Sequence, residues 1–128
     1  MPPLPPPSDP PTPAGRGRAL FRVAYPAAER PRFILEDGTV GRVMDCSELG
    51  LRYRLEGGDP HPRFGAVVAG RVEFRTGAPA TVSGRVVRVG AGEIALQLAA
   101  PGLPLRIIFA EQRALRARYP YHDAEPTQ

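Results

Sequence analysis

Two short groups of polar residues could together bind a ligand. Arg18 and Arg22 are separated by three residues, and the segment from Asp45 to Gly50 supplies an acid, a hydroxyl group and a glycine within a few positions. A guanidinium can hold a phosphate or the edge of a guanine through two parallel hydrogen bonds. A carboxylate can accept from N–H groups or orient an arginine, and a serine hydroxyl can donate or accept. These residue types favour binding of an anionic partner.

Each group alone also has a purely structural explanation. Arginine pairs at this spacing arise by chance in an arginine-rich chain, and Arg71 and Arg75 form a second pair that alternates with apolar residues as a strand does. Asp45 and Ser47 can hydrogen-bond turn backbone, and Gly50 can supply a positive φ angle. We expect these three residues on a turn between two strands, outside the core.

Patterns that indicate catalysis or metal binding are missing from the sequence. The two histidines are His61, in a proline-rich loop, and His122, near the C-terminus, and no cluster has metal-site spacing. Cys46 has no histidine expected near it to activate it as a nucleophile. Glycine-rich phosphate loops, dinucleotide fingerprints and serine-hydrolase elbows are also missing. We therefore expect a protein that is not an enzyme, with no metal and no cofactor.

Short strands must position these residues. Alternation of apolar and polar residues is typical of strands with one buried face. Asp37-Gly38 indicates a hairpin turn, and a β-branched run indicates a strand that is partly buried on both faces. The expected strands cover 33–35, 39–44, 51–55, 71–75, 82–89 and 93–98.

The apolar period changes after the last expected strand. Residues 105–119 place their apolar side chains near one helical face, with Pro104 at the start and Pro120 at the end. Strands in series with short turns and a terminal helix fit a closed barrel better than alternating strands and helices. The sequence predicts an all-β barrel of about six antiparallel strands, followed by one C-terminal helix.

The composition limits which partners the protein can bind and in which cellular compartment we expect it. The chain has 128 residues and a net charge of +4, and every one of its 17 basic residues is arginine. Codon bias in a GC-rich genome could produce this composition, and an anionic partner is the functional alternative. A single cysteine, Cys46, excludes an internal disulfide and favours a reducing compartment. With neither a signal peptide nor an apolar stretch long enough to span a bilayer, we expect a soluble cytoplasmic protein.

The chain divides into three parts. Residues 1–15 are rich in proline and are expected to form a flexible tail, because such a segment forms neither a helix nor a central strand. Residues 16–120 form the expected barrel domain, and residues 121–128 a second flexible tail. The N-terminal tail is more simply interpreted as a spacer than as a ligand for a proline-binding module.

The arginine pair followed by the Asp-x-Ser-x-x-Gly segment, with strands on both sides, resembles the PilZ domain family of cyclic di-GMP receptors. The resemblance runs from about Arg18 to Tyr119 and implies a six-stranded antiparallel barrel with a C-terminal helix. It implies that Arg18 and Arg22 clamp the dinucleotide against the turn residues, which are Asp45, Ser47 and Gly50.

The resemblance leaves the number of bound ligands open. Family members bind one cyclic di-GMP or a stacked pair, and the residues just before Arg18 help to decide between them. Gly17 stands directly before Arg18, and Arg16 adds another guanidinium, which favours the pair. The expected function is a receptor that signals to a protein partner in motility, pili or exopolysaccharide synthesis.

Two other functions compete with this one. A nucleic-acid-binding barrel is compatible with the basic charge, but single-strand binders interleave aromatic residues with their basic groove, and only 7% of residues here are aromatic. A PilZ-like domain that binds protein alone is the second alternative, and the complete arginine and Asp-x-Ser-x-x-Gly motifs argue against it.

Overall fold

The strands form where apolar residues recur at every second position. A computed structural model describes residues 21–57 and 61–120. Its strands are β1 (Val23–Ala24), β2 (Arg32–Leu35), β3 (Val40–Cys46), β4 (Gly50–Leu55), β5 (Val67–Glu73), β6 (Ala80–Gly90) and β7 (Glu93–Leu98). The helices of this part of the chain are the short 3-10 helix η1 (Ala27–Glu29) and α2 (Leu105–Arg118).

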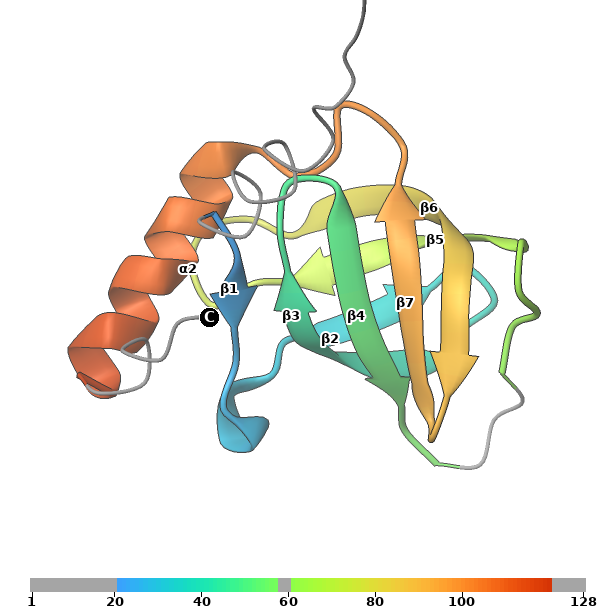
Figure 1. The fold of residues 1–128 in the computed structure, drawn as a ribbon. Helices are drawn as coiled ribbons and strands as arrows, with labels where there is room; N and C mark the ends of the chain where they lie inside the picture. Colours follow the sequence, from blue (N-terminus) through green and yellow to red (C-terminus); the bar gives the residue numbers. More distant parts are fainter. Residues whose placement is uncertain (1–20, 58–60, 121–128) are drawn as a thin grey trace, which may run out of the picture.

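Six of these strands close into an antiparallel barrel (Figure 1). The sheet runs β3-β2-β5-β6-β7-β4, and it closes because β3 also pairs with β4. The seventh strand, β1, pairs with the far end of β3, where Val23 lies opposite Cys46. The expected barrel and C-terminal helix are confirmed. The strand β1 was not expected, since two residues are too few to show an alternation.

The barrel interior is filled by aromatic and branched side chains. Phe33 and Tyr53 are fully buried and meet edge to face, with ring centroids 5.0 Å apart. Burial raises the pKa of Tyr53 to about 12. Gly41 has no room for a side chain, because a Cβ there would lie 2.7 Å from a ring carbon of Tyr53. Core packing thus requires the Tyr53 ring to lie directly against the backbone of Gly41.

A bulge in β3 changes which way its last residues point. Val43 lies opposite Tyr53, yet the next pair joins Asp45 to Arg52, so Met44 is the extra residue. An inserted residue shifts the alternation by one position. Asp45 therefore lies on the outer face beside Arg52, and Cys46 turns inward and is fully buried. Without the bulge, regular alternation from Val43 would aim the Asp45 carboxylate into the core.

The helix α2 is fastened to the barrel by a buried carboxylate. Its inner face carries Ile108, Glu111 and Leu115, which are all buried. The Glu111 side chain accepts hydrogen bonds from the Tyr25 hydroxyl at 2.6 Å and from the backbone N–H and the hydroxyl of Thr76 at 2.8 and 2.7 Å. Three donors thus satisfy a carboxylate that burial would otherwise destabilise.

A second carboxylate holds the C-terminal end of the helix. Glu29 in η1 accepts a hydrogen bond from the Tyr119 hydroxyl at 2.7 Å and forms ion pairs with Arg75 and Arg118. The hydrogen bond from Tyr119 lowers the pKa of Glu29, and the two arginines act in the same direction. Glu111 and Glu29 together fix the helix at its middle and at its end.

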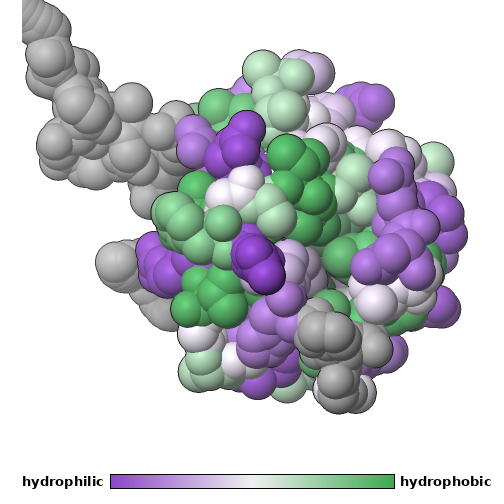
Figure 2. All heavy atoms as spheres, turned by 90° about the vertical axis from the view of Figure 1, so that its right-hand side faces the viewer, coloured by the Kyte–Doolittle hydropathy of each residue, from purple (hydrophilic) through white to green (hydrophobic). Residues whose placement is uncertain are grey.

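The outer surface mixes charged and apolar residues. Figure 2 shows hydrophobic residues exposed between hydrophilic ones on one side of the molecule. Phe64 is 76% exposed and Val67 is 64% exposed. Neither helix of the described residues is long and apolar enough to cross a membrane.

Replacing Glu111 tests how the helix is fastened. We expect Glu111→Ala to lower the free energy of unfolding by about 1–3 kcal/mol for each buried donor that it leaves without an acceptor. Glu73→Ala is the control, since Glu73 forms long, partly exposed ion pairs with Arg32 and Arg71. That change should cost less than about 1 kcal/mol. Urea denaturation measures both, and equal losses would contradict the role of Glu111.

Candidate functional site

The Asp45 carboxylate is the centre of the candidate site. It is buried, and it accepts hydrogen bonds on Oδ2 from the Nη2 and Nε atoms of Arg52 at 2.6 and 3.0 Å. The hydrogen bond to Asp45 raises the pKa of Arg52. Charge-assisted bonds of this length are among the stronger ones in proteins. Arg52 is therefore held in one orientation while its side chain remains 41% exposed.

Arg22 approaches the same carboxylate from the other side. Its Nη2 lies 3.8 Å from Oδ1 of Asp45, and its side chain is 54% exposed. This contact is long, so the Arg22 guanidinium is near Asp45 but keeps most of its hydrogen-bonding capacity. The arginine and acid groups that are far apart in the sequence thus come together, as the resemblance implies for Arg22 and Asp45.

The helix α2 positions the backbone before β1. The amide of Gln112 donates to the backbone carbonyl of Arg22 at 2.7 Å. The rings of Phe21 and Phe109 meet edge to face, with centroids 5.4 Å apart. Arg22 therefore projects from a segment that is already packed on the helix, which limits the backbone entropy that a ligand would have to remove there.

The candidate site continues along the outer face of the barrel as alternating charges. Arg52 also donates to Glu93 at 3.1 Å, and Glu93 accepts from Arg54 at 3.1 Å. The candidate site is thus a chain of residues with alternating charge, in the order Arg22, Asp45, Arg52, Glu93 and Arg54. Arg52 and Glu93 were missing from the residues expected at the site. The alternation of 51–55 placed Arg52 on the wet face, but only the strand register brings it opposite Asp45.

The expected turn between two strands is confirmed for Ser47, which lies between β3 and β4, and is wrong for Asp45. The expectation that both residues lie outside the core is wrong. Asp45 lies in β3, and the two residues are only 5% and 6% exposed. The positive φ angle expected for Gly50 is also wrong, because Gly50 begins β4 with no positive φ. A Cβ at Gly50 would instead lie 3.3 Å from the Ser47 hydroxyl oxygen. The glycine allows close packing against Ser47, and no left-handed turn requires it.

The segment after β7 supports the loop between β3 and β4. The N–H groups of Leu98 and Leu103 donate to the carbonyls of Leu49 and Glu48 at 2.9 and 2.8 Å. Gly102 has a φ angle of 73°, and a Cβ there would lie 2.0 Å from the Glu48 carbonyl oxygen. The Ser47–Gly50 loop is therefore held from behind by backbone that only glycine can form.

The remaining reactive groups do not assemble into a catalytic centre in the described part of the chain. Cys46 is fully buried, and this burial raises the pKa of its thiol, which disfavours the nucleophilic thiolate. His61 lies exposed between β4 and β5. The described residues contain no group of three or more His, Cys, Asp and Glu side chains that could hold a metal ion.

Several expected residues lie elsewhere or outside the described ranges. Arg16, Arg18 and His122 fall outside them, as do both proposed tails, 1–15 and 121–128. Arg71 and Arg75, the second arginine pair, form ion pairs with Glu73 and Glu29. The positions of Arg16 and Arg18 relative to Asp45 therefore stay predictions.

A closed antiparallel barrel of six strands, with an added strand and a C-terminal helix across it, is the fold of a PilZ domain. Among solved structures the chain is similar to the PilZ domain with c-di-GMP of YcgR from Escherichia coli, with a TM-score of 0.62 and 19% sequence identity. The match covers 77% of this chain and 93% of that one, which confirms the expected fold. No protein-family model matches the chain, and no curated protein does.

Two glycines test how the loop is built. We expect Gly102→Ala to lower the free energy of unfolding by about 2 kcal/mol or more, because it adds both a steric clash and an unfavourable φ. Gly50→Ala should cost less than about 1 kcal/mol, because its backbone is not in the left-handed region and only the Ser47 side chain must shift. Urea denaturation of the two variants measures this difference. Equal losses would show that Gly50 is constrained in a way that its packing does not explain.

Proposed function

We propose that this protein is a receptor for cyclic di-GMP. The observation that carries the proposal is the convergence of Arg22 and Arg52 on the buried Asp45 carboxylate, within a PilZ fold. The similar solved structure is a PilZ domain with c-di-GMP, which supports the choice of this ligand. The proposed site combines the barrel face that carries Asp45 and Arg52 with Arg22, which precedes β1 and is held by α2.

The exposed guanidinium groups suit the ligand's chemistry. Cyclic di-GMP offers two phosphodiester groups and two guanines, and a guanidinium can bind either a phosphate or the O6 and N7 edge of guanine with two hydrogen bonds. Arg22 has no close hydrogen bond from its guanidinium to the described residues, so it can turn toward a ligand with little loss. Asp45 can accept from the guanine N–H edge or keep both arginines oriented.

We further propose that Arg18 completes the clamp. It lies four positions before Arg22 in the chain, and Arg16 adds a third guanidinium to the segment. A stacked pair of ligands would present more phosphate groups to these residues than a single one. We also place Ser47 and Gly50 beside the ligand, where Gly50 allows close packing against the Ser47 hydroxyl.

The proposed output is a change in a protein partner and not a chemical reaction. The groups at the site, arginines paired with a buried acid, are suited to binding an anion, and the protein would act in the cytoplasm on motility, pili or exopolysaccharide synthesis. A barrel that binds nucleic acid or protein alone is the alternative, and a titration with cyclic di-GMP separates them. Binding of linear single-stranded DNA with no binding of cyclic di-GMP would contradict the proposal.

The Arg22 side chain provides the most direct test. We expect Arg22→Ala to weaken cyclic di-GMP binding by about 1–3 kcal/mol, the range for a good bidentate contact to guanine. Arg22→Lys should not restore binding, because lysine lacks the planar fork. Isothermal titration calorimetry measures both.

Arg71→Ala is the matched control for this measurement. Arg71 is 50% exposed and forms one ion pair at 3.6 Å, while Arg22 is 54% exposed and forms one at 3.8 Å. The two arginines thus differ mainly in place. Equal weakening by both substitutions would mean that only the general positive charge matters, and the site assignment would fail. Arg75 is a poor control, since its ion pair with the buried Glu29 contributes to the fold.

A clamp also predicts where the backbone becomes protected. Hydrogen exchange with and without cyclic di-GMP should slow at residues 18–22 and at Asp45–Gly50, because the ligand would lie between them. Saturating ligand at a hundredfold excess over its dissociation constant should stabilise the fold by about 2.7 kcal/mol. Protection at Asp45–Gly50 alone would retain the receptor and remove the clamp.

A further inference from the structure

A row of arginines crosses the barrel wall from Arg54, at the end of the candidate site. Arg32 on β2 lies opposite Arg42 on β3, and Arg42 lies opposite Arg54 on β4. Like charges directly opposite each other on neighbouring strands are destabilising. Glu73, Glu56 and Glu93 each pair with one member of the row, so the repulsion is partly offset. Arg30 adds a fourth guanidinium beside Arg42 and Arg54, and it forms no ion pair with the described residues, so the local charge favours an anionic ligand there.

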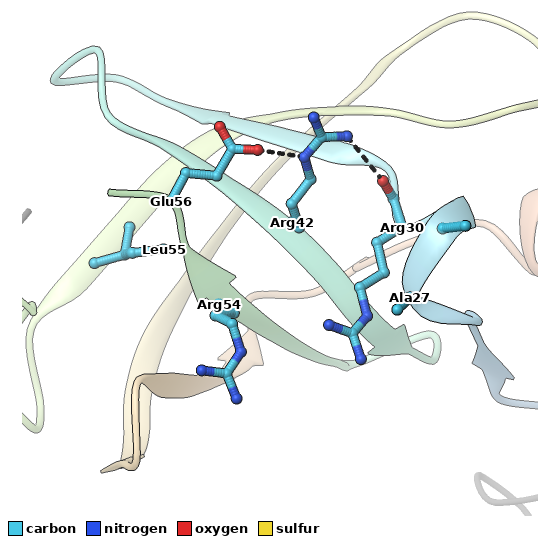
Figure 3. A pocket seen from close by; sticks show the side chains of 7 residues that line it. Ala27, Arg30, Arg42, Arg54, Leu55 and Glu56 are labelled. Atoms are coloured by element: carbon cyan, nitrogen blue, oxygen red, sulfur yellow. Dashed lines mark hydrogen bonds and ion pairs between the residues drawn. The ribbon is translucent and has the colours of Figure 1, made fainter. Parts of the chain in front are cut away.

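This row borders a pocket of about 450 Å³. Its walls include Arg30, Arg42 and Arg54, and the acid among the residues that line it is Glu56 (Figure 3). In Figure 3, Arg42 points toward Glu56, whereas the side chains of Arg30 and Arg54 run the other way in this view, with a gap between their guanidinium groups. The volume falls within the usual range for small-molecule sites.

Arg30 is the most informative residue of the pocket. Its Nε is buried without a hydrogen-bond partner, and its guanidinium forms no ion pair with the described residues. A buried donor without a partner is costly and rare in folded proteins. Arg42 holds the backbone here, since its Nη1 donates to the Arg30 carbonyl at 3.3 Å. An anion placed between Arg30 and Arg54 would supply the acceptor that Arg30 lacks.

We propose that this pocket is a second ligand site, which binds the phosphate group of a small molecule. A phosphate carries several acceptor oxygens around one negative centre, and separate guanidinium groups can each bind one edge of it. The centre of this pocket differs from the centre of the cyclic di-GMP site, because its lining residues include neither Arg22 nor Asp45 nor Arg52. Arg54 borders both sites. The two sites meet through Glu93, which pairs with both Arg54 and Arg52.

Titration with inorganic phosphate tests the proposal on the full chain. The side-chain Nε–H resonances of the arginines are followed by NMR, and calorimetry gives the affinity. We expect a saturable shift of the Arg30 signal, and at least about a tenfold weaker affinity in Arg30→Gln, which removes a charged hydrogen-bond partner. Glu56→Gln should instead strengthen phosphate binding, because it removes the acid that competes for Arg42. Glucose 6-phosphate in place of phosphate, with glucose as its control, distinguishes a phosphomonoester ligand from free phosphate.

Two matched variants keep the outcome interpretable. Arg71→Gln, on β5 and outside the pocket, should leave phosphate affinity unchanged, and so should Arg22→Ala. A shift that sodium chloride reproduces at equal ionic strength would overturn the proposal, as would equal losses in Arg30→Gln and Arg71→Gln. Loss of phosphate binding in Arg22→Ala would place the anion at the cyclic di-GMP site and would overturn the second site alone. Failure to bind cyclic di-GMP would leave the phosphate result unaffected.

Discussion

The ion pair between Asp45 and Arg52 depends on one inserted residue in β3. The bulge at Met44 turns Asp45 to the outer face and Cys46 to the core, and strand pairing then sets Arg52 directly opposite the acid. A carboxylate that is only 5% exposed would destabilise the fold if it had no partner. Its pairing with Arg52 therefore serves stability, and it also holds a half-exposed guanidinium in one place. The ion pair between Asp45 and Arg52 thus contributes to the fold and orients a guanidinium at the candidate site.

Buried carboxylates recur where the chain must join separate elements. Glu111 joins α2 to Tyr25 and Thr76, and Glu29 joins η1 to Arg75 and the end of α2. These contacts are directional, so they specify how the helix lies on the barrel more narrowly than apolar packing alone. Because α2 also holds the Arg22 backbone through Gln112, the helix fastening bears directly on the candidate site.

The arginine-rich composition has more than one use in this fold. Arg75 and Arg118 satisfy the buried Glu29. Arg22 forms only a long contact with Asp45 at 3.8 Å, and Arg30 forms no ion pair with the described residues. Arginines with full partners stabilise the protein, and arginines with unused donors can bind ligands. An arginine's role here therefore depends on the hydrogen-bond and ion-pair partners of its guanidinium, and the total number of arginines does not decide it. Codon bias can account for how many arginines the chain has, but it does not account for which of them lack partners.

The sequence alone was enough to predict the barrel and the C-terminal helix. Period-two alternation and the Asp37-Gly38 turn depend on local chemistry, and so does the helical period after Pro104. The tertiary structure decided the environment of the site. Strand register and the bulge determine how Asp45 pairs with Arg52. They also determine the burial of Asp45 and Ser47 and the extended backbone of Gly50. Register is set by the closure of the whole barrel, so contacts between residues on different strands cannot be read from the spacing within one strand.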